Sequence, residues 1–325
     1  MNTDRSIRFM HGIMIFGSNI NLGGGFQMSL SEKIYKNGEE IIKEGDIGKS
    51  FFLLTEGKAG VYSNYEKNNP FRIAVIDPGE YFGEMAILEA YPRSASVIAI
   101  GNVHAIEIPA DEMNLFFEEN PEQVLELITH LANRIALMTD DYNESQNLLK
   151  EVHAASNETK NDSFFSKIKK HISLYQSNKN SLSEPSSDAL RADLSVSGET
   201  DSFQKGSVIF KEGESGDCMF LLRNGSVGLY TGYGKPDALK SASLEAVSVF
   251  GEDGLTSTDP RSVTAVAEGD NTRVEIIYME DLDEIVKSSP AKVNLILRCL
   301  SYRLRRLNID FLKNCKEITE AYNDK

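Results

Sequence analysis

Short apolar runs separated by glycines dominate two stretches of the chain. Residues 50–55 and 218–222 are examples of such runs, and both are rich in Phe and Leu. Short β-favouring segments with glycine turns between them are typical of an antiparallel barrel or a double-sheet roll. Glycine is expected where φ is positive or where two backbones approach closely. We therefore expect an α+β fold that is mainly β, built on β-rolls of the jelly-roll kind, each around a concave pocket.

The two stretches are copies of one unit. Their glycines recur at a constant offset (206 − 38 = 168), and the pairs include Gly38 with Gly206, Gly48 with Gly216, Gly57 with Gly225, and Gly60 with Gly228. A chain of 325 residues has room for two domains of ordinary size. The repeat therefore predicts two domains of the same fold.

An amphipathic helix follows each roll. Its apolar residues alternate in steps of four and three, and they are Val124, Ile128, Leu131, Ile135, Met138 and Tyr142 in the first copy, and Val293, Leu297, Leu300, Leu304, Leu307 and Phe311 in the second. Such spacing predicts a long helix with one apolar seam. The first turns are expected to cap their own roll. The later turns extend beyond what a small roll can cover. They either pair with another helix, in cis or in a homodimer through the long helices, or only continue the cap.

The residues between the repeats have the composition of a linker, rich in Ser, Asn, Lys and Asp. Within them, apolar residues stand at helical spacing among basic ones, namely Phe165, Ile168, Ile172 and Tyr175. This island is either a basic helix that docks on a partner or on an acidic face of this protein, or a transient helix, which is the default interpretation. The predicted organisation is a flexible leader (1–27), a first domain with its long helix (28–152), the linker (153–201) and a second domain with its long helix (202–325).

Charge and composition oppose several classes of function. The net charge of −15 opposes general binding to nucleic acid or to an anionic membrane. No apolar run approaches the roughly 18 residues of a membrane span. The three cysteines lack metal-site spacing and are typical of a reducing cytosol. We expect a cytoplasmic protein with no metal, no cofactor, no DNA partner and no membrane partner.

The repeat also contains a pattern suited to binding a phosphate beside a sugar. The first cassette (residues 82–94) and the second cassette (residues 250–262) read Phe82-Gly83-Glu84-Met85-Ala86-Ile87, ending at Pro92-Arg93-Ser94, and Phe250-Gly251-Glu252-Asp253-Gly254-Leu255, ending at Pro260-Arg261-Ser262. The gap from Glu to Arg is the same in both (93 − 84 = 9 and 261 − 252 = 9). A turn after Gly-Glu offers backbone N–H groups to an anion, the Arg offers a charged fork, and the Glu can accept from a ribose hydroxyl.

The pattern resembles the phosphate-binding cassette of cyclic nucleotide-binding domains. By this resemblance, Glu84 bonds the ribose 2′-hydroxyl, Arg93 pairs with the cyclic phosphate, and backbone N–H groups around Gly83, Met85 and Ala86 complete the anion site. The alternative for Glu84 and Arg93 is an internal ion pair that closes the turn. We expect the first cassette to bind ligand.

The second cassette departs from the family pattern. Gly251, Glu252, Gly254, Arg261 and Ser262 supply the same kinds of group, and on this basis we expect the second cassette to bind as well. The alternative is a degenerate structural copy, because Asp253 brings a negative charge towards the phosphate. In addition, the turn at residues 78–81 has no counterpart at residues 246–249.

The ligand expected from the resemblance is cAMP rather than cGMP. The residue after each Arg is a serine, Ser94 or Ser262, as in bacterial cAMP receptors, and this likeness also suggests a bacterial source. Thr139 is similar in position to the residue of those receptors that meets the adenine edge. Because Ser can also serve guanine, cGMP stays open.

We expect a non-catalytic cyclic nucleotide sensor that regulates a protein effector. The chain has no G-x-S-x-G and no H-E-x-x-H motif, and its five histidines are scattered. One alternative is a scaffold that keeps the fold without the ligand. Another is a regulatory subunit of a protein kinase, which also carries tandem domains. The Arg-Arg inhibitory segment of such subunits is not recognisable here, since the one Arg pair, Arg305-Arg306, lies on the polar side of the last seam.

Overall fold

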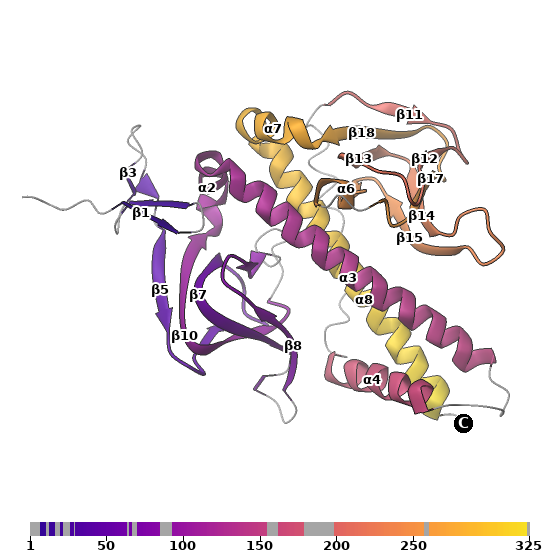
Figure 1. Cartoon of the computed structure of the whole chain (residues 1–325), viewed down its shortest axis with the longest axis horizontal. Helices are drawn as coiled ribbons and strands as arrows, with labels where there is room; N and C mark the ends of the chain where they lie inside the picture. The colour runs from indigo at the N-terminus through magenta and orange to yellow at the C-terminus, as the bar shows by residue number, and fades with distance from the viewer. Residues whose placement is uncertain are drawn as a thin grey trace, which may run out of the picture. The chain divides into compact units, whose positions relative to one another are not determined.

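The computed structural model describes residues 7–10, 13–16, 20–21, 27–28, 30–63, 65–66, 70–84, 93–154, 162–178, 198–256 and 260–323. The chain divides into two compact units, Met1–Leu127 and Ile128–Lys325. Figure 1 labels their elements. Among the helices of the described residues, none is both long and apolar enough to cross a membrane.

The first unit contains an antiparallel β-roll. Its strands are β5 (Ser31–Tyr35), β6 (Glu40–Ile42), β7 (Ser50–Ser63), β8 (Phe71–Ile76), β9 (Tyr81–Phe82) and β10 (Ser96–Pro109). They run in the order β5-β10-β7-β8, with β6 paired to β10 and β9 paired to β7. The roll is followed by η1 (Ala110–Glu112), α2 (Met113–Glu119) and the first turns of α3 (Pro121–Ala154).

Two short hairpins lie where the sequence predicts a flexible leader. Strand β1 (Ile7–Met10) pairs with β2 (Ile13–Phe16), and β3 (Ile20–Asn21) pairs with β4 (Gln27–Met28). Met10 and Ile13 form the last pair of the first hairpin, so a connection of two residues joins its strands. Residues 7–10 and 13–16 of the predicted leader are therefore paired strands.

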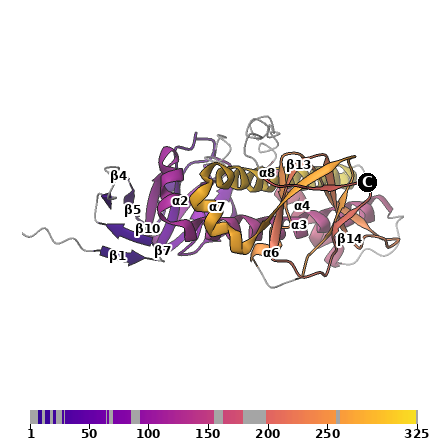
Figure 2. The same cartoon turned by 90° about the horizontal axis from the view of Figure 1, so that it is seen from above.

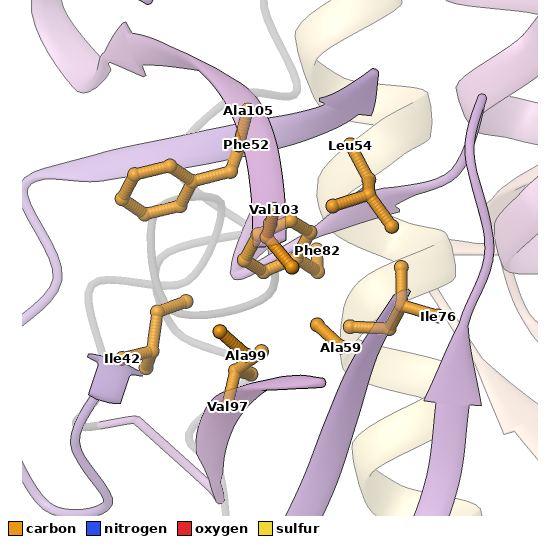
Figure 3. Close-up of a cluster of buried hydrophobic side chains, with 10 residues drawn as sticks. All are labelled: Ile42, Phe52, Leu54, Ala59, Ile76, Phe82, Val97, Ala99, Val103 and Ala105. Carbon is orange, nitrogen blue, oxygen red and sulfur yellow. The ribbon is translucent and has the colours of Figure 1, made fainter. Parts of the chain in front are cut away.

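Figure 3 shows the core of the first roll, in which alternate side chains of the strands point inward. Phe52 of β7 stacks on Phe82 of β9 with ring centroids 5.2 Å apart. The buried members of this core are Ile42, Phe52, Leu54, Ala59, Ile76, Phe82, Val97, Ala99, Val103 and Ala105. Because Phe82 immediately precedes the first cassette, the same packing that forms the core fixes where the cassette begins.

The second unit repeats this roll. Its strands are β11 (Asp201–Phe203), β12 (Val208–Phe210), β13 (Cys218–Asn224), β14 (Ser226–Thr231), β15 (Leu239–Glu245), β16 (Ser248–Phe250), β17 (Thr264–Ala267) and β18 (Thr272–Tyr278). They form two sheets, β11-β18-β13-β16 and β12-β17-β14-β15. The long β7 corresponds to β13 and β14, and the long β10 corresponds to β17 and β18. The predicted mainly β fold with two β-rolls is confirmed.

The longest helical segments of the second unit, among the described residues, are the part of α3 from Ile128 onward, α4 (Asp162–Asn178) and α8 (Pro290–Asn323). Helix α8 follows α6 (Asp253–Thr256), η3 (Met279–Asp281) and α7 (Leu282–Ser288) along the chain. Met138 and Tyr142 of α3 pack against Phe311 and Leu312 of α8. The later seam positions therefore pair in cis, and the homodimer stays a prediction.

The basic island of the linker forms α4 and lies alongside α8, as Figure 2 shows. Ile168 is buried against Ile318 of α8, and Lys167 lies 3.0 Å from Glu144 of α3. This is the docked arrangement on an acidic face of the protein rather than the transient helix. The other linker residues, 155–161 and 179–197, lie outside the described part of the chain.

Glycine at position 57 is required by the close approach of two strands. Its φ is +83°, and an added Cβ would lie 2.2 Å from the carbonyl oxygen of Asn102. Gly38 has the same backbone conformation, with φ of +82°, but a Cβ there would meet nothing within 4 Å. The two positions therefore separate backbone strain from a steric clash.

We expect Gly57→Ala to destabilise the protein more than Gly38→Ala. The positive φ alone costs about 1–2 kcal/mol for an L-residue. The clash at position 57 adds about 1–3 kcal/mol, as in other overpacked sites. Urea unfolding followed by circular dichroism measures both variants, and equal losses would show that the approach of Asn102 is readily relieved.

Candidate functional site

The first cassette begins at a turn that requires glycine. Gly83 has φ of +81°, and a Cβ there would lie 2.7 Å from Cδ1 of Ile42 and 2.8 Å from Nη1 of Arg93. The next residue, Glu84, is buried at 2% exposure. Strand β9 and its pairing with β7 thus bring the predicted glutamate into the interior of the roll.

Arg93 is fixed beside this turn by backbone carbonyls. Its Nη1 donates to the oxygen of Gly83 (2.5 Å), and its Nη2 donates to the oxygen of Ser50. Burial lowers the pKa of the Arg93 guanidinium, and the nearby Glu84 carboxylate opposes that shift most strongly. The arginine is therefore a fixed fork on the rim of the roll rather than a mobile surface cation.

The remaining predicted residues of the first cassette are less fully placed. Ser94 is exposed directly after Arg93. Met85 and Ala86 lie outside the described residues, so their expected role as donors of backbone N–H groups stays a prediction.

The second cassette holds its arginine in the same way. Arg261 donates from Nη1 to the oxygen of Gly251 (2.5 Å) and from Nη2 to the oxygen of Cys218 (2.7 Å). Gly251 and Cys218 are the repeat equivalents of Gly83 and Ser50 (251 − 83 = 168 and 218 − 50 = 168). The Arg261 guanidinium also lies over the ring of Phe210, 4.7 Å from its centroid. The two cassettes therefore share one scaffold.

A carboxylate occupies the donors of the second cassette. Oδ1 of Asp253 lies 3.2 Å from Nη1 of Arg261 and accepts from the N–H of Gly254 (3.0 Å). Oδ2 accepts from the N–H and the hydroxyl of Ser262, at 3.2 and 3.0 Å. The Asp253 carboxylate thus accepts hydrogen bonds from three residues that were predicted to contact ligand, namely Gly254, Arg261 and Ser262.

The glutamate of the second cassette is paired with a residue that the sequence analysis missed. Glu252 is 5% exposed, and Nη1 of Arg303 in α8 donates to its two oxygens at 2.7 and 2.6 Å. Burial raises the pKa of the Glu252 carboxyl, while Arg303 lowers it. A signal for Arg303 was present, because Arg134 stands at the equivalent place in α3 (303 − 134 = 169, the offset of the helices).

A pocket of about 800 Å³ lies beside the second cassette, within the second unit. Gly251, Glu252 and Ser262 line it from the roll, Tyr302 lines it from α8, and Thr139 lines it from α3. The hydroxyl of Thr139 donates to the oxygen of Ile135 (2.7 Å). Thr139, which was predicted to lie near the adenine edge, therefore lines the pocket beside the second cassette.

Two segments of the chain, residues 32–120 and 200–289, match the family model for the cyclic nucleotide-binding domain. They cover both rolls and both cassettes and together more than half of the chain. The protein therefore belongs to the cyclic nucleotide-binding domain family and carries the domain twice, which confirms the resemblance.

Curated relatives include signalling proteins from protists. The chain is 25% identical to a cAMP-dependent protein kinase regulatory subunit of Dictyostelium discoideum, over 77% of this chain and 63% of that protein. It is 48% identical to a cGMP-dependent protein kinase of Plasmodium berghei over 65 residues, or 20% of this chain and 7% of that protein. The chain thus spans less than two thirds of the length of either relative.

Among solved structures, the regulatory domain of Toxoplasma gondii PKA with cAMP is 18% identical to this chain, with a TM-score of 0.26. The match covers 81% of this chain and 83% of that one.

Proposed function

We propose that this protein is a non-catalytic receptor in which the first domain binds a cyclic nucleotide, cAMP in preference to cGMP. The observation that carries the proposal is the buried Arg93, held by the carbonyls of Gly83 and Ser50 beside the buried Glu84. A fixed guanidinium matches the two charged oxygens of a cyclic phosphate, and a buried carboxylate suits a ribose hydroxyl. Ser94 favours cAMP through its likeness to cAMP receptors.

The output we propose is regulation of a protein effector. Ligand in the first cassette favours one position of the segment that follows the roll, so binding is transmitted as a shift in the packing of α2 and the start of α3. The Dictyostelium relative, matched over 77% of this chain, is named a kinase regulatory subunit, which supports an effector of the protein kinase class. We place this receptor in the cytoplasm.

The proposal predicts that cyclic nucleotide stabilises the folded chain. A ligand that binds only the folded state adds RT ln(1 + [L]/Kd), or about 2.7 kcal/mol at a hundredfold excess over Kd. We expect millimolar cAMP to raise the Tm by several degrees, cGMP to raise it less, and 5′-AMP to leave it unchanged. Differential scanning fluorimetry measures all three on the full chain.

An absence of any shift on well-folded protein would contradict the proposal. The scaffold alternative predicts that result, because a scaffold keeps the rolls without the ligand. A larger shift with cGMP than with cAMP would keep the receptor and reverse the assignment of its ligand.

A further inference from the structure

The contacts of Asp253 are those of a bound anion rather than those of a surface side chain. Its oxygens meet a guanidinium, two backbone N–H groups and a hydroxyl, contributed by Arg261, Gly254 and Ser262. The side chain of Arg261 is 3% exposed and that of Asp253 is 28% exposed, so the pair lies at the mouth of the site. Donors of the same kinds are expected to bind phosphate in the first cassette.

A carboxylate resembles a cyclic phosphate in the features that these donors recognise. Both present two oxygens that share one negative charge, and both accept hydrogen bonds from a guanidinium and from backbone N–H groups. Asp253 is the first residue of α6, and this position in the fold places its carboxylate beside Arg261 and Ser262. The phosphate position of the second cassette is therefore filled from within the chain.

The charges of the second cassette also balance without ligand. Two carboxylates, Glu252 and Asp253, face two guanidinium groups, Arg261 and Arg303. A cyclic phosphate would add a third negative charge and would have to displace the Asp253 carboxylate from its donors. Like charges placed together in a partly buried site repel each other and oppose binding.

The first cassette lacks such a charge at the equivalent position. The residue there is Met85 (253 − 168 = 85), which cannot compete for the arginine. The arginines of the two cassettes are otherwise held by equivalent carbonyls. The change from Met to Asp is thus the difference that bears most directly on phosphate binding.

We propose that Asp253 is an internal substitute for the cyclic phosphate and sets the affinity of the second site, so that this site binds cyclic nucleotide far more weakly than the first. The proposal rests on the proposed function of the first cassette. It revises the expectation that both cassettes bind ligand. It also attributes the weak affinity of the second site to one side chain.

Isothermal titration calorimetry of the full chain with cAMP tests the proposal. We expect the wild-type protein to bind one cAMP per chain, and Asp253→Met, which introduces the residue of the first repeat, to bind two. In a background of Arg93→Ala, which removes the first site, Asp253→Met is expected to raise the remaining affinity by about 100-fold or more. Asp237→Ala, at an exposed acidic residue of the same domain, is the control and leaves the stoichiometry at one.

Two further measurements separate the phosphate from the rest of the ligand. Adenosine carries the base and the ribose without phosphate, so Asp253→Met is expected to leave adenosine binding unchanged. In the reverse experiment, Met85→Asp is expected to lower the affinity of the first site for cAMP by a similar factor. If Asp253→Met folds poorly, Asp253→Asn removes the charge while keeping the shape, and it is expected to act in the same direction.

The outcomes are distinguishable from failure of the proposed function. Two equal cAMP sites in the wild-type chain, or one site in well-folded Asp253→Met, would overturn the role of Asp253 while the receptor stands. A wild-type chain that binds neither cAMP nor cGMP would overturn the proposed function itself. An equal gain for adenosine would show that Asp253 acts on the pocket in general and not through the phosphate position.

Discussion

Arg93→Ala is expected to abolish high-affinity binding of cyclic nucleotide to the first domain. Arg93 is held at the cassette by two carbonyl oxygens, so its fork is oriented before the ligand arrives. Truncating one member of a desolvated, hydrogen-bonded charge pair costs about 2–5 kcal/mol of affinity. That loss corresponds to roughly 30-fold to several thousand-fold in Kd, measured by calorimetry with cAMP.

Matched variants distinguish the loss of the fork from the loss of the fold. Arg72→Ala, at an exposed arginine on β8 of the same roll, is expected to leave the Kd unchanged. Arg93→Lys keeps the charge without the planar fork, so an intermediate affinity is expected. Since Arg93→Ala also leaves two carbonyls without that donor, the circular dichroism of each variant is compared first. A folded Arg93→Ala that binds cAMP as tightly as the wild type would contradict the assignment.

Glu275→Ala is expected to be among the most destabilising single changes in the second domain. Glu275 of β18 accepts from Nε of Arg223 (2.9 Å) in β13 and from Nζ of Lys292 (2.7 Å) in α8. The side chains of Glu275, Arg223 and Lys292 are 6%, 9% and 14% exposed. Removing the carboxylate leaves two buried cations without this partner, and such a loss costs about 3–5 kcal/mol.

The repeat provides a control for this prediction. Glu107 stands at the equivalent position of the first roll (275 − 107 = 168). Its side chain is 27% exposed and lies 3.4 Å from the half-exposed Lys33, so Glu107→Ala is expected to cost only about 1 kcal/mol. Urea unfolding gives the totals, and hydrogen exchange in β13, β18 and α8 locates the loss. Equal costs at the two positions would contradict the role of burial.

The sequence was sufficient to predict the fold because its signals are local and occur twice. Glycines at turns, short apolar strands and the seams of the long helices each depend on neighbouring residues. The constant offset between the repeats made a chance origin of the two cassettes unlikely. In the structure, Arg93 and Arg261 donate to equivalent carbonyl oxygens. The domain boundaries and the contacts of the ligand stay predictions.

The sequence was not sufficient to predict the partners of those residues. Arg303 reaches Glu252 across 51 positions of the chain. Arg134 stands at the equivalent place in the first repeat, but the neighbours of Arg303 in the sequence do not identify its partner. The resemblance placed Thr139 near the adenine edge without indicating which cassette it adjoins, and in the structure it lines the pocket beside the second cassette. Helix α4 was by default expected to be a transient helix in a loose linker, and its packing on α8 is what stabilises it.

The sequence by itself determined which residues carry the chemistry: a repeated Gly-Glu turn, an arginine nine positions later, and one acidic residue, Asp253, where the first copy has a methionine. These properties follow from residue type and spacing, which folding does not change. Only the tertiary structure decided what each group contacts. Asp253 reaches Arg261 and Ser262 because the roll brings the two ends of the second cassette together, and hydrogen bonds form by distance in space rather than in sequence.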